Sequence, residues 1–462
     1  MVATVFFSAI FLFMIGYYIR FLAVDSKDIL NDSYNYRIKK KESTVVKGTI
    51  YSSDKKALAY TDMKDTPRDV SDDKRVYPYG KMFAHIVGID SHGGYGIEKD
   101  YRYKLLFNDS DSIQKIVDDF KNEIPRGLDI YTTLNVGIQK KAYNELGDIK
   151  GAVFMMDPES GKIIASVSKP SYNPNTINEN WEKISSDSSN SKLLNRATQG
   201  QYTPGSIFKI VTALEFMKEN KNYQNYSYDC NGYANFKGFK IECFDGNAHY
   251  REDLKHAFAY SCNSAFSSIG DELKVSKFKK TAESLLFNKD LPLDITFNTS
   301  KFMLNKKSSQ FDVTQTSIGQ GKTMVSPAHM CMIASAIAND GVLMKPYIIK
   351  KITDHNSNVK TKTKKQEYGI LIKKKYAKQL KDYMSAVCDY GTGSIMNGSV
   401  YDAYGKTGTA ELDKNGHINS WFVGFAKHNG KKVAIAVVLE NIEEGDAKAV
   451  NIAKEILDYY YY

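Results

Sequence analysis

The pattern of hydrophobic and polar residues separates one uncharged segment at the start of the chain from a long mixed body. Residues 2–19, VATVFFSAIFLFMIGYYI, carry no charged side chain. Roughly 18 apolar residues are about the minimum for a helix that crosses a hydrocarbon core of ~30 Å. A cleaved signal peptide is the alternative, but the segment lacks a charged start and a clear small-residue cleavage site. We therefore expect a single transmembrane anchor over residues 1–24.

Strand-like patterns follow the anchor. Residues 48–60, GTIYSSDKKALAY, predict two short strands about a Ser-Ser-Asp turn. Residues 25–150 are therefore expected to form a small β-rich domain. The pattern sharpens at residues 151–168, where the apolar runs GAVFMM and KIIASVS flank the turn DPESG and predict a hairpin. A second, larger domain is expected to begin there and to occupy residues 151–462.

The larger domain combines hairpins at both of its ends with helices between them. Residues 423–441 predict a second hairpin that turns at Asn429-Gly430. Apolar residues recur at helical spacing in three segments, residues 207–217, 327–337 and 447–457. This arrangement predicts an α+β fold in which an antiparallel sheet joins the two ends of the domain and helices surround it.

Two polar segments are expected on the surface. Residues 183–192, KISSDSSNSK, are rich in serine and lie between apolar segments, which predicts an exposed loop. The Lys-rich residues 350–375 are most simply a solvated loop and helix edge, and a polymer-binding patch is the alternative.

Composition excludes several classes of protein. A chain of 462 residues is too long for one ordinary core, and 42% hydrophobic with 25% charged residues argues against both wholesale disorder and a polytopic membrane protein. The formal charge of +10 would attract anions, but net charge does not specify chemistry, and we expect no nucleic-acid partner. Five cysteines are too few for a disulfide scaffold.

Candidate chemistry begins at the segment TPGSIFKI. It places Ser206 and Lys209 at positions i and i+3, so a helix that begins near Pro204 would carry hydroxyl and amine on one face. A serine hydroxyl is a weak nucleophile until a neighbouring base takes its proton, and a partly buried lysine can be neutral enough to do so. A lone Ser-x-x-Lys is common by chance and usually lies on a solvated helix.

Two further motifs make the signal specific. Ser261-Cys262-Asn263 follows Ser206, and Lys406-Thr407-Gly408-Thr409 follows near the C-terminal hairpin, in the order found in penicillin-recognising serine enzymes. With the segments MMDPESGKIIASVSKPSYNPN, NRATQGQYTPGSIFK, SIGQGKTMVSPAHM, YGKTGTAE and SWFVGFA, the chain resembles a class B penicillin-binding protein of minimal architecture, the peptidoglycan D,D-transpeptidase. The resemblance covers nearly the whole chain.

The resemblance implies a role for each motif residue. Ser206 would form an acyl-enzyme with a stem peptide and would also react with β-lactams, while Lys209 accepts its proton. Ser261 would relay the proton to the leaving amine, Asn263 would bind the substrate amide, and Lys406 would give electrostatic support. Thr407 and Thr409 are expected to bind the terminal carboxylate, with Gly408 leaving room for substrate and the backbone N–H groups of Ser206 and Thr409 forming the oxyanion hole. No catalytic cofactor is expected.

The segments before residue 150 also match the family. GTIYSSDKKALA, RVYPYG and YGIEKDY look like the N-terminal motifs of its pedestal, a noncatalytic domain of dimerisation type, although Lys47 stands where arginine is more usual. The basic residues that follow the anchor, Arg20, Lys27, Arg37 and Lys39-Lys40-Lys41, would by the positive-inside rule alone place the body in the cytoplasm. The chemistry that the resemblance implies overrides this rule, and residues 151–462, the transpeptidase domain, are expected outside the membrane. No glycosyltransferase domain fits between the anchor and residue 150, so a separate polytopic glycosyltransferase of the shape, elongation, division and sporulation family is the expected partner.

A candidate metal site lies in the larger domain. Cys230, Cys243, His249 and Cys262 form a complete tetrahedral donor set of the type zinc prefers, with Asp229 and Asp245 as substitute ligands. A Cys230–Cys243 disulfide and three separately buried thiols are the competing interpretations. Some elongation-type relatives carry zinc in the corresponding stretch, which favours a structural zinc ion. Cys331 and Cys388 lie among apolar residues and are expected in the core.

Two other functions share these sequence features. A D-alanyl-D-alanine carboxypeptidase or a β-lactamase would use the same three motifs, but the pedestal argues against both. A noncatalytic antibiotic sensor or a scaffold would not need Lys209 and Lys406 intact, and a sensor would normally need a signalling domain across the membrane, which we do not expect before a span that begins at Val2.

Overall fold

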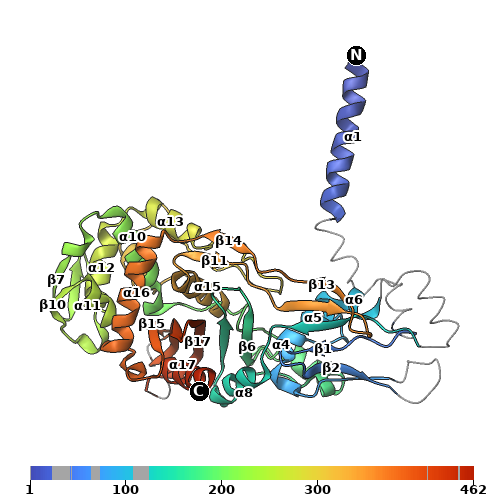
Figure 1. Ribbon diagram of the computed structural model, residues 1–462. Helices are drawn as coiled ribbons and strands as arrows, with labels where there is room; N and C mark the ends of the chain where they lie inside the picture. Colours follow the sequence, from blue (N-terminus) through green and yellow to red (C-terminus); the bar gives the residue numbers. More distant parts are fainter. Residues whose placement is uncertain are drawn as a thin grey trace. The chain divides into compact units, whose positions relative to one another are not determined.

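One antiparallel sheet brings the two predicted hairpins side by side. The computed structural model describes residues 2–22, 42, 44–63, 73–107, 124–413, 415–445 and 448–462 (Figure 1). The sheet has the order β15-β16-β17-β5-β6, with β15 at one edge. Its strands are β15 (Asp402–Glu411), β16 (His417–His428), β17 (Lys431–Glu443), β5 (Gly151–Met156) and β6 (Ile163–Lys169). Both hairpins and the α+β fold class predicted from the sequence are confirmed.

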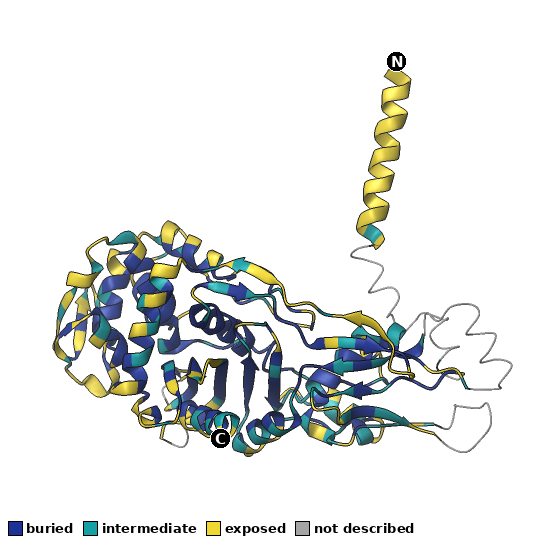
Figure 2. Ribbon diagram, viewed as in Figure 1, coloured by how far each residue is buried: buried dark blue, intermediate teal, exposed yellow. Residues whose placement is uncertain are grey.

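Helices cover both faces of this sheet. Helices α8 and α17 pack on one face through a cluster that includes Val153, Phe422 and Val437, and α15 contacts the strands on the other face (Figure 1). Burial is nearly complete in the central strands and in α15 (Figure 2). The helices of this part of the chain are α8 (Val136–Glu145), η4 (Gly205–Phe208), α10 (Lys209–Glu219), η5 (Tyr223–Asn225), η6 (Phe244–Gly246), α11 (Leu254–Ala259), α12 (Asn263–Glu272), α13 (Val275–Ser284), α14 (Gln310–Ser317), α15 (Pro327–Ala338), α16 (Lys374–Asp389), η7 (Ser394–Met396) and α17 (Ala449–Tyr461).

The predicted helices are present with shifted ends. Residues 207–217 fall in η4 and α10, and residues 327–337 fall in α15. The third predicted helix corresponds to α17, and residue 447 lies outside the described residues. Three small ribbons complete this part, formed by β7 (Ser227–Cys230) with β10 (Tyr250–Asp253), β8 (Tyr233–Phe236) with β9 (Phe239–Glu242), and β11 (Val342–Met344) with β14 (Glu367–Ile370).

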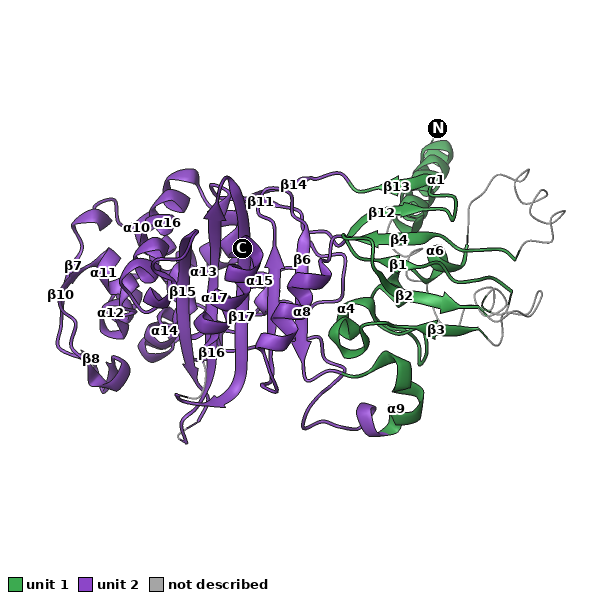
Figure 3. Cartoon of the chain, turned by 60° about the horizontal axis from the view of Figure 1, so that its bottom comes forward, with its two compact units in different colours: residues 1–132, 172–182, 349–363 green, residues 133–171, 183–348, 364–462 purple. Residues whose placement is uncertain are grey.

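The chain divides into two units, which Figure 3 shows in different colours. One comprises residues 1–132, 172–182 and 349–363, and the other the remaining segments. The first unit holds a six-stranded sheet of order β13-β12-β4-β1-β2-β3. Its elements are β1 (Ile50–Tyr51), β2 (Ala57–Asp62), β3 (Lys74–Val76), η2 (Gly80–Met82), α4 (Ala84–Val87), α5 (Gly96–Asp100), α6 (Arg102–Leu106), β4 (Asp129–Thr132), η3 (Pro174–Thr176), most of α9 (Ile177–Ser185), β12 (Ile349–Thr353) and β13 (Val359–Lys362).

Two predictions about polar segments are correct only in part. The Lys-rich residues 350–375 are largely exposed to solvent and reach the start of α16, as predicted, but they form strands β12, β13 and β14 rather than a loop, because Ile349 and Ile352 pair with β4 while the lysines stay outside. The segment 183–192 is a loop only after Ser185, where α9 ends.

The N-terminal motifs of the first unit meet around buried charges. The Arg75 Nε atom donates to Glu98 Oε1 at 2.8 Å, and both side chains are buried. Lys47, where arginine is more usual, forms an ion pair of 3.2 Å with Asp90. The first pair joins the RVYPYG motif to the YGIEKDY motif, and Arg75 also donates to the Gly48 carbonyl oxygen at 2.9 Å, which connects both motifs to the strand segment of residues 48–60.

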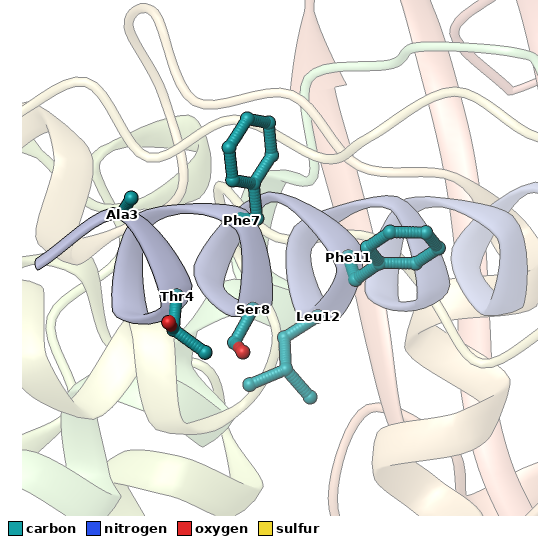
Figure 4. Close-up of a pocket in the computed structure, with 6 residues that line it drawn as sticks. All are labelled: Ala3, Thr4, Phe7, Ser8, Phe11 and Leu12. Carbon is teal, nitrogen blue, oxygen red and sulfur yellow. The ribbon is translucent and has the colours of Figure 1, made fainter. Parts of the chain in front are cut away.

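The N-terminal apolar segment forms helix α1 (Val2–Arg20), with a mean hydropathy of 2.1 and no buried residue. It is the only helix among the described residues long and apolar enough to cross a membrane. A hollow on its surface is lined by six residues of this one helix, Ala3, Thr4, Phe7, Ser8, Phe11 and Leu12 (Figure 4). It is therefore the space between neighbouring side chains, and the helix fits a single-pass membrane anchor.

Candidate active site

Ser206 lies in a tight 3-10 turn, η4, which leads directly into α10. The sequence predicted a helix that starts near Pro204, and the first turn proves to be of the 3-10 type, in which residues i and i+3 are eclipsed. Gly205 has φ +55°, and a Cβ atom there would lie 2.5 Å from the carbonyl oxygen of Thr409. Only glycine therefore allows the Ser206 turn to approach strand β15 this closely.

Lys209 is fully buried and joins the first motif to the second. Its Nζ atom donates to the Ser261 carbonyl oxygen at 2.6 Å and to Asn263 Oδ1 at 2.7 Å, and lies 3.1 Å from Ser261 Oγ. The described residues contain no hydrogen bond between Lys209 and Ser206. Burial lowers the pKa of Lys209 to about 8, although the Cys262 thiol and the Glu252 carboxyl act in the opposite direction.

The second motif sits between α11 and α12. Ser261 has φ +61°, a left-handed conformation that is uncommon for serine and that directs its side chain toward Lys209. Cys262 caps α12, with its Sγ accepting from the Ala265 N–H at 3.3 Å. The Asn263 Nδ2 atom donates to the Glu242 carbonyl oxygen at 3.0 Å, a contact that no sequence feature predicted. Asn263 is therefore held from two directions.

The third motif lies on edge strand β15, against the Ser206 turn. Lys406 is fully buried, and its Nζ atom donates to the Thr407 carbonyl oxygen at 3.1 Å. Burial, together with the charge of Lys209, lowers the Lys406 pKa well below its ordinary value. A Cβ atom on Gly408 would lie 3.0 Å from both Ile207 Cγ2 and the Pro204 carbonyl oxygen. Glycine thus lets the third motif approach the first.

Thr407 and Thr409 occupy alternate positions of β15, so they point to the same face of the strand, and Thr409 is exposed. The Thr407 Oγ1 atom lies 2.5 Å from Thr392 Oγ1 in the loop after α16. Sequence reasoning missed Thr392, because nothing in the sequence relates its segment to the third motif. The structure therefore brings all three motifs together within the second unit.

The four predicted metal ligands also come together. The ligand atoms of Cys230, Cys243, His249 and Cys262 all lie within 4.8 Å of one another. The sulfur of Cys243 lies 3.6 Å from that of Cys230 and 3.7 Å from that of Cys262. These distances exceed the ~2.05 Å of a disulfide bond, and all five cysteines are free and buried. Asp229 and Asp245 are not members of the cluster.

The cluster is chemically suited to a soft divalent cation. Hydrogen bonding from Cys262 lowers the pKa of the Cys243 thiol, and hydrogen bonding to Cys243 raises that of His249 to about 9. Thiolate and imidazole are the donors that zinc prefers, in tetrahedral geometry. Glu252 is buried beside the cluster, next to Cys262. The residues present fit a zinc ion.

Comparison with known proteins identifies the family to which the chain belongs. Residues 151–458 match the family model described as the penicillin binding protein transpeptidase domain. The peptidoglycan D,D-transpeptidase PbpA of Mycolicibacterium smegmatis is 29% identical over 399 residues, which cover 79% of each chain. The protein of the same name from Mycobacterium tuberculosis is 27% identical over 417 residues, which cover 83% of each.

Solved structures agree with these relatives. The D,D-transpeptidase domain of a peptidoglycan glycosyltransferase from Eggerthella lenta is 28% identical, with a TM-score of 0.80 over 90% of this chain and 98% of that one. Penicillin-binding protein A from M. tuberculosis, solved as its imipenem acyl-enzyme complex, shares the fold with a TM-score of 0.81, 24% identity, and coverage of 91% and 100%. The chain therefore belongs to the penicillin-binding protein transpeptidase family, as the class B resemblance of its sequence predicted.

Proposed function

We propose that Ser206 carries the D,D-transpeptidase reaction of this family member. Ser206 Oγ attacks the carbonyl carbon of the penultimate D-alanine of a stem peptide while Lys209 Nζ takes the hydroxyl proton. The bond to the terminal D-alanine then breaks, and Ser261 passes a proton to the leaving amine. An amine of a neighbouring strand attacks the acyl-enzyme, which forms the cross-link and frees Ser206. β-Lactams acylate the same oxygen and stop the cycle.

The remaining motif residues bind and orient the substrate. Asn263 donates to the substrate amide through its second N–H, because one N–H is already bonded to the Glu242 carbonyl. Thr407 and Thr409 bind the terminal carboxylate. The backbone N–H groups of Ser206 and Thr409 stabilise the oxyanion. Burial favours the neutral amine of Lys406 in the free enzyme, and an arriving carboxylate would favour its charged form.

One observation carries this assignment most directly. A lysine amine that is fully buried, has a pKa lowered to about 8, and bonds to both Ser261 and Asn263 is unusual for a structural side chain. Burying it raises the fraction of neutral base near neutral pH, which is what proton abstraction from a serine requires. The eclipsed 3-10 geometry puts this base on the side of the turn that carries Ser206.

The test is intact-protein mass spectrometry after incubation with a penicillin. The parent should gain the mass of one penicillin, and peptide mapping should place it on Ser206. The Ser206→Ala protein should stay unlabelled. Persistent labelling of that variant would show that another residue is the nucleophile.

Cys230, Cys243, His249 and Cys262 hold one structural zinc ion in this proposal. Four protein ligands fill the tetrahedron and leave no open position for water, and the serine chemistry needs no metal. Cys262 lies between Ser261 and Asn263, so a metal bond there would fix the backbone that aims both catalytic side chains. Metal analysis of protein purified under reducing conditions tests this, and a mapped Cys230–Cys243 disulfide would contradict it.

Residues 1–24 anchor the chain, residues 25–150 form the pedestal and residues 151–462 the transpeptidase domain, which lies outside the cell membrane. The outward orientation is supported by the chemistry, because cross-linking acts on a wall assembled outside the membrane. Cysteines introduced in the loop 186–192 should react with an impermeant maleimide on whole cells. Protection of these cysteines until the membrane is opened would refute the orientation.

A separate membrane glycosyltransferase of the shape, elongation, division and sporulation family supplies the glycan strands. Support comes from the sequence, in which no polymerising domain fits between the anchor and residue 150. Co-purification of the full chain from membranes should recover such a polymerase. Pedestal substitutions that leave both co-purification and polymerisation unchanged would contradict this partnership.

A further inference from the structure

Trp421 connects the sheet to the loop that carries the nucleophile. It lies on β16, is 1% exposed, and pairs directly with Gly408 of the third motif. Its indole N–H donates to the Thr203 carbonyl oxygen at 3.1 Å, three residues before Ser206. One side chain therefore reaches from the strand next to β15 to the start of the Ser206 turn.

The same loop is held by a second aromatic residue. The Tyr202 ring packs edge-on against Trp421, with ring centroids 5.9 Å apart at an interplanar angle of 78°. The Tyr202 hydroxyl donates to Glu440 Oε2 on β17 at 3.0 Å, and Glu440 also accepts from Arg196 Nε at 2.6 Å. Strands β16 and β17, through Trp421 and Glu440, thus form hydrogen bonds with the consecutive loop residues Tyr202 and Thr203.

These hydrogen bonds bear on the geometry of the oxyanion hole, because its two proposed donors belong to different elements. The Ser206 N–H comes from the 3-10 turn, and the Thr409 N–H comes from β15. Gly205 and Gly408 remove the Cβ atoms that would hold the two elements apart, but glycine supplies no bond that holds them together. The hydrogen bond from Trp421 to Thr203 provides such a bond, through the strand paired with β15.

We propose that Trp421 is a positioning residue for the oxyanion hole: by holding the Thr203 carbonyl, its indole N–H sets the distance between the Ser206 and Thr409 N–H groups. The inference rests on the roles proposed above for Ser206 and Thr409. Loss of the indole N–H weakens polarisation of the bound carbonyl but leaves noncovalent binding intact. We expect acylation to slow about tenfold, less than the ~100-fold or more that follows removal of an oxyanion donor itself.

The test compares Trp421→Phe with a control on the adjacent residue. Trp421→Phe keeps an aromatic ring and removes the N–H. Phe422→Leu alters an equally buried ring on the opposite face of the sheet, where it packs with α8 and α17. Stopped-flow acylation by a penicillin gives the acylation rate constant and the noncovalent dissociation constant separately. Infrared difference spectra with a ¹³C-labelled carbonyl report hydrogen bonding to the acyl oxygen.

Trp421→Phe should lower the acylation rate constant about tenfold, leave the noncovalent dissociation constant within about twofold, and move the acyl carbonyl band to higher frequency, as expected when oxyanion donors are misplaced. Phe422→Leu should lower the melting temperature and leave the band in place. An unchanged band in Trp421→Phe, or an equal band shift in Phe422→Leu, would overturn the proposal.

Replacement of Trp421 by benzothienylalanine, in which sulfur takes the place of the indole N–H, tests the same point at constant shape if Trp421→Phe does not fold. It should reproduce the slower acylation and the band shift, and parent-like values for both would overturn the proposal. If the parent protein itself is not acylated on Ser206, the result would contradict the proposed function rather than the positioning role of Trp421.

Discussion

Raising the pH should accelerate acylation of Ser206, because Lys209, the base that we propose, can accept a proton only in its neutral form. Burial lowers the pKa of Lys209 to about 8. The neutral fraction then rises from about 1% at about pH 6 to about 90% at about pH 9, which predicts a roughly ninetyfold increase in rate. The rate should approach a plateau above that range, since little protonated amine remains.

An unperturbed lysine would behave differently. With the ordinary pKa of about 10.5, the neutral fraction at about pH 7 would be roughly 300-fold smaller, and the rate would still climb steeply beyond about pH 9. The position of the plateau therefore measures how strongly burial acts on this amine. The sign is fixed, because burial disfavours the charged form of a lysine.

The assay is the rate of labelling by a fluorescent penicillin, measured across the pH range with the protein folded throughout. Lys209→Ala should slow labelling by at least about a hundredfold, the usual scale for loss of a general base, and should flatten the profile. Lys221→Ala, at an exposed position just beyond the end of the same helix, should leave rate and profile unchanged. A parent profile without a rise near pH 8, or one that Lys209→Ala leaves intact, would refute the reasoning.

Other outcomes follow from the same geometry. Gly408→Ala should slow acylation about tenfold, because the added methyl group presses on Ile207 and moves β15 away from the Ser206 turn; labelling at the parent rate would contradict this. Chelation of zinc should lower the melting temperature and slow β-lactam acylation together, and Cys230→Ser should do the same, as calorimetry with parallel labelling would show. The penicilloyl adduct should persist for hours by mass spectrometry, whereas rapid turnover would indicate a hydrolase.

The sequence marks the candidate catalytic residues more clearly than the contacts that surround them. Ser206 and Lys209 are recognisable because the chemistry needs them at fixed spacing within one turn, and the hairpins were visible because residues close in sequence pair with each other. The bond between Trp421 and Thr203 joins segments far apart in sequence, and neither residue type marks it. Strand β12 was missed for a similar reason: its partner, β4, lies in another part of the sequence, and β13 pairs only with β12.

The candidate metal ligands were only partly predictable from the sequence. The three thiols and one imidazole of Cys230, Cys243, His249 and Cys262 indicated a metal site. Their spacing in the sequence could not show whether the four side chains meet at one point or are buried separately. Convergence depends on the pairing of β7 with β10, which sets Cys230 opposite Tyr250, next to His249. It also depends on the cap of α12, which turns Cys262 inward.

The pairing of β17 with β5 has a consequence for synthesis of the protein. Residues 151–156 pair with the nearby β6 on one side, but on the other side they pair with residues 434–439, so the sheet cannot be completed until β17 has been synthesised. The Ser206 turn is synthesised long before strand β15, which carries Lys406 and packs against this turn. Nascent or truncated chains that end before β17 would therefore carry Ser206 without a complete penicillin-reactive site, and reactivity would appear only after β17 has been synthesised.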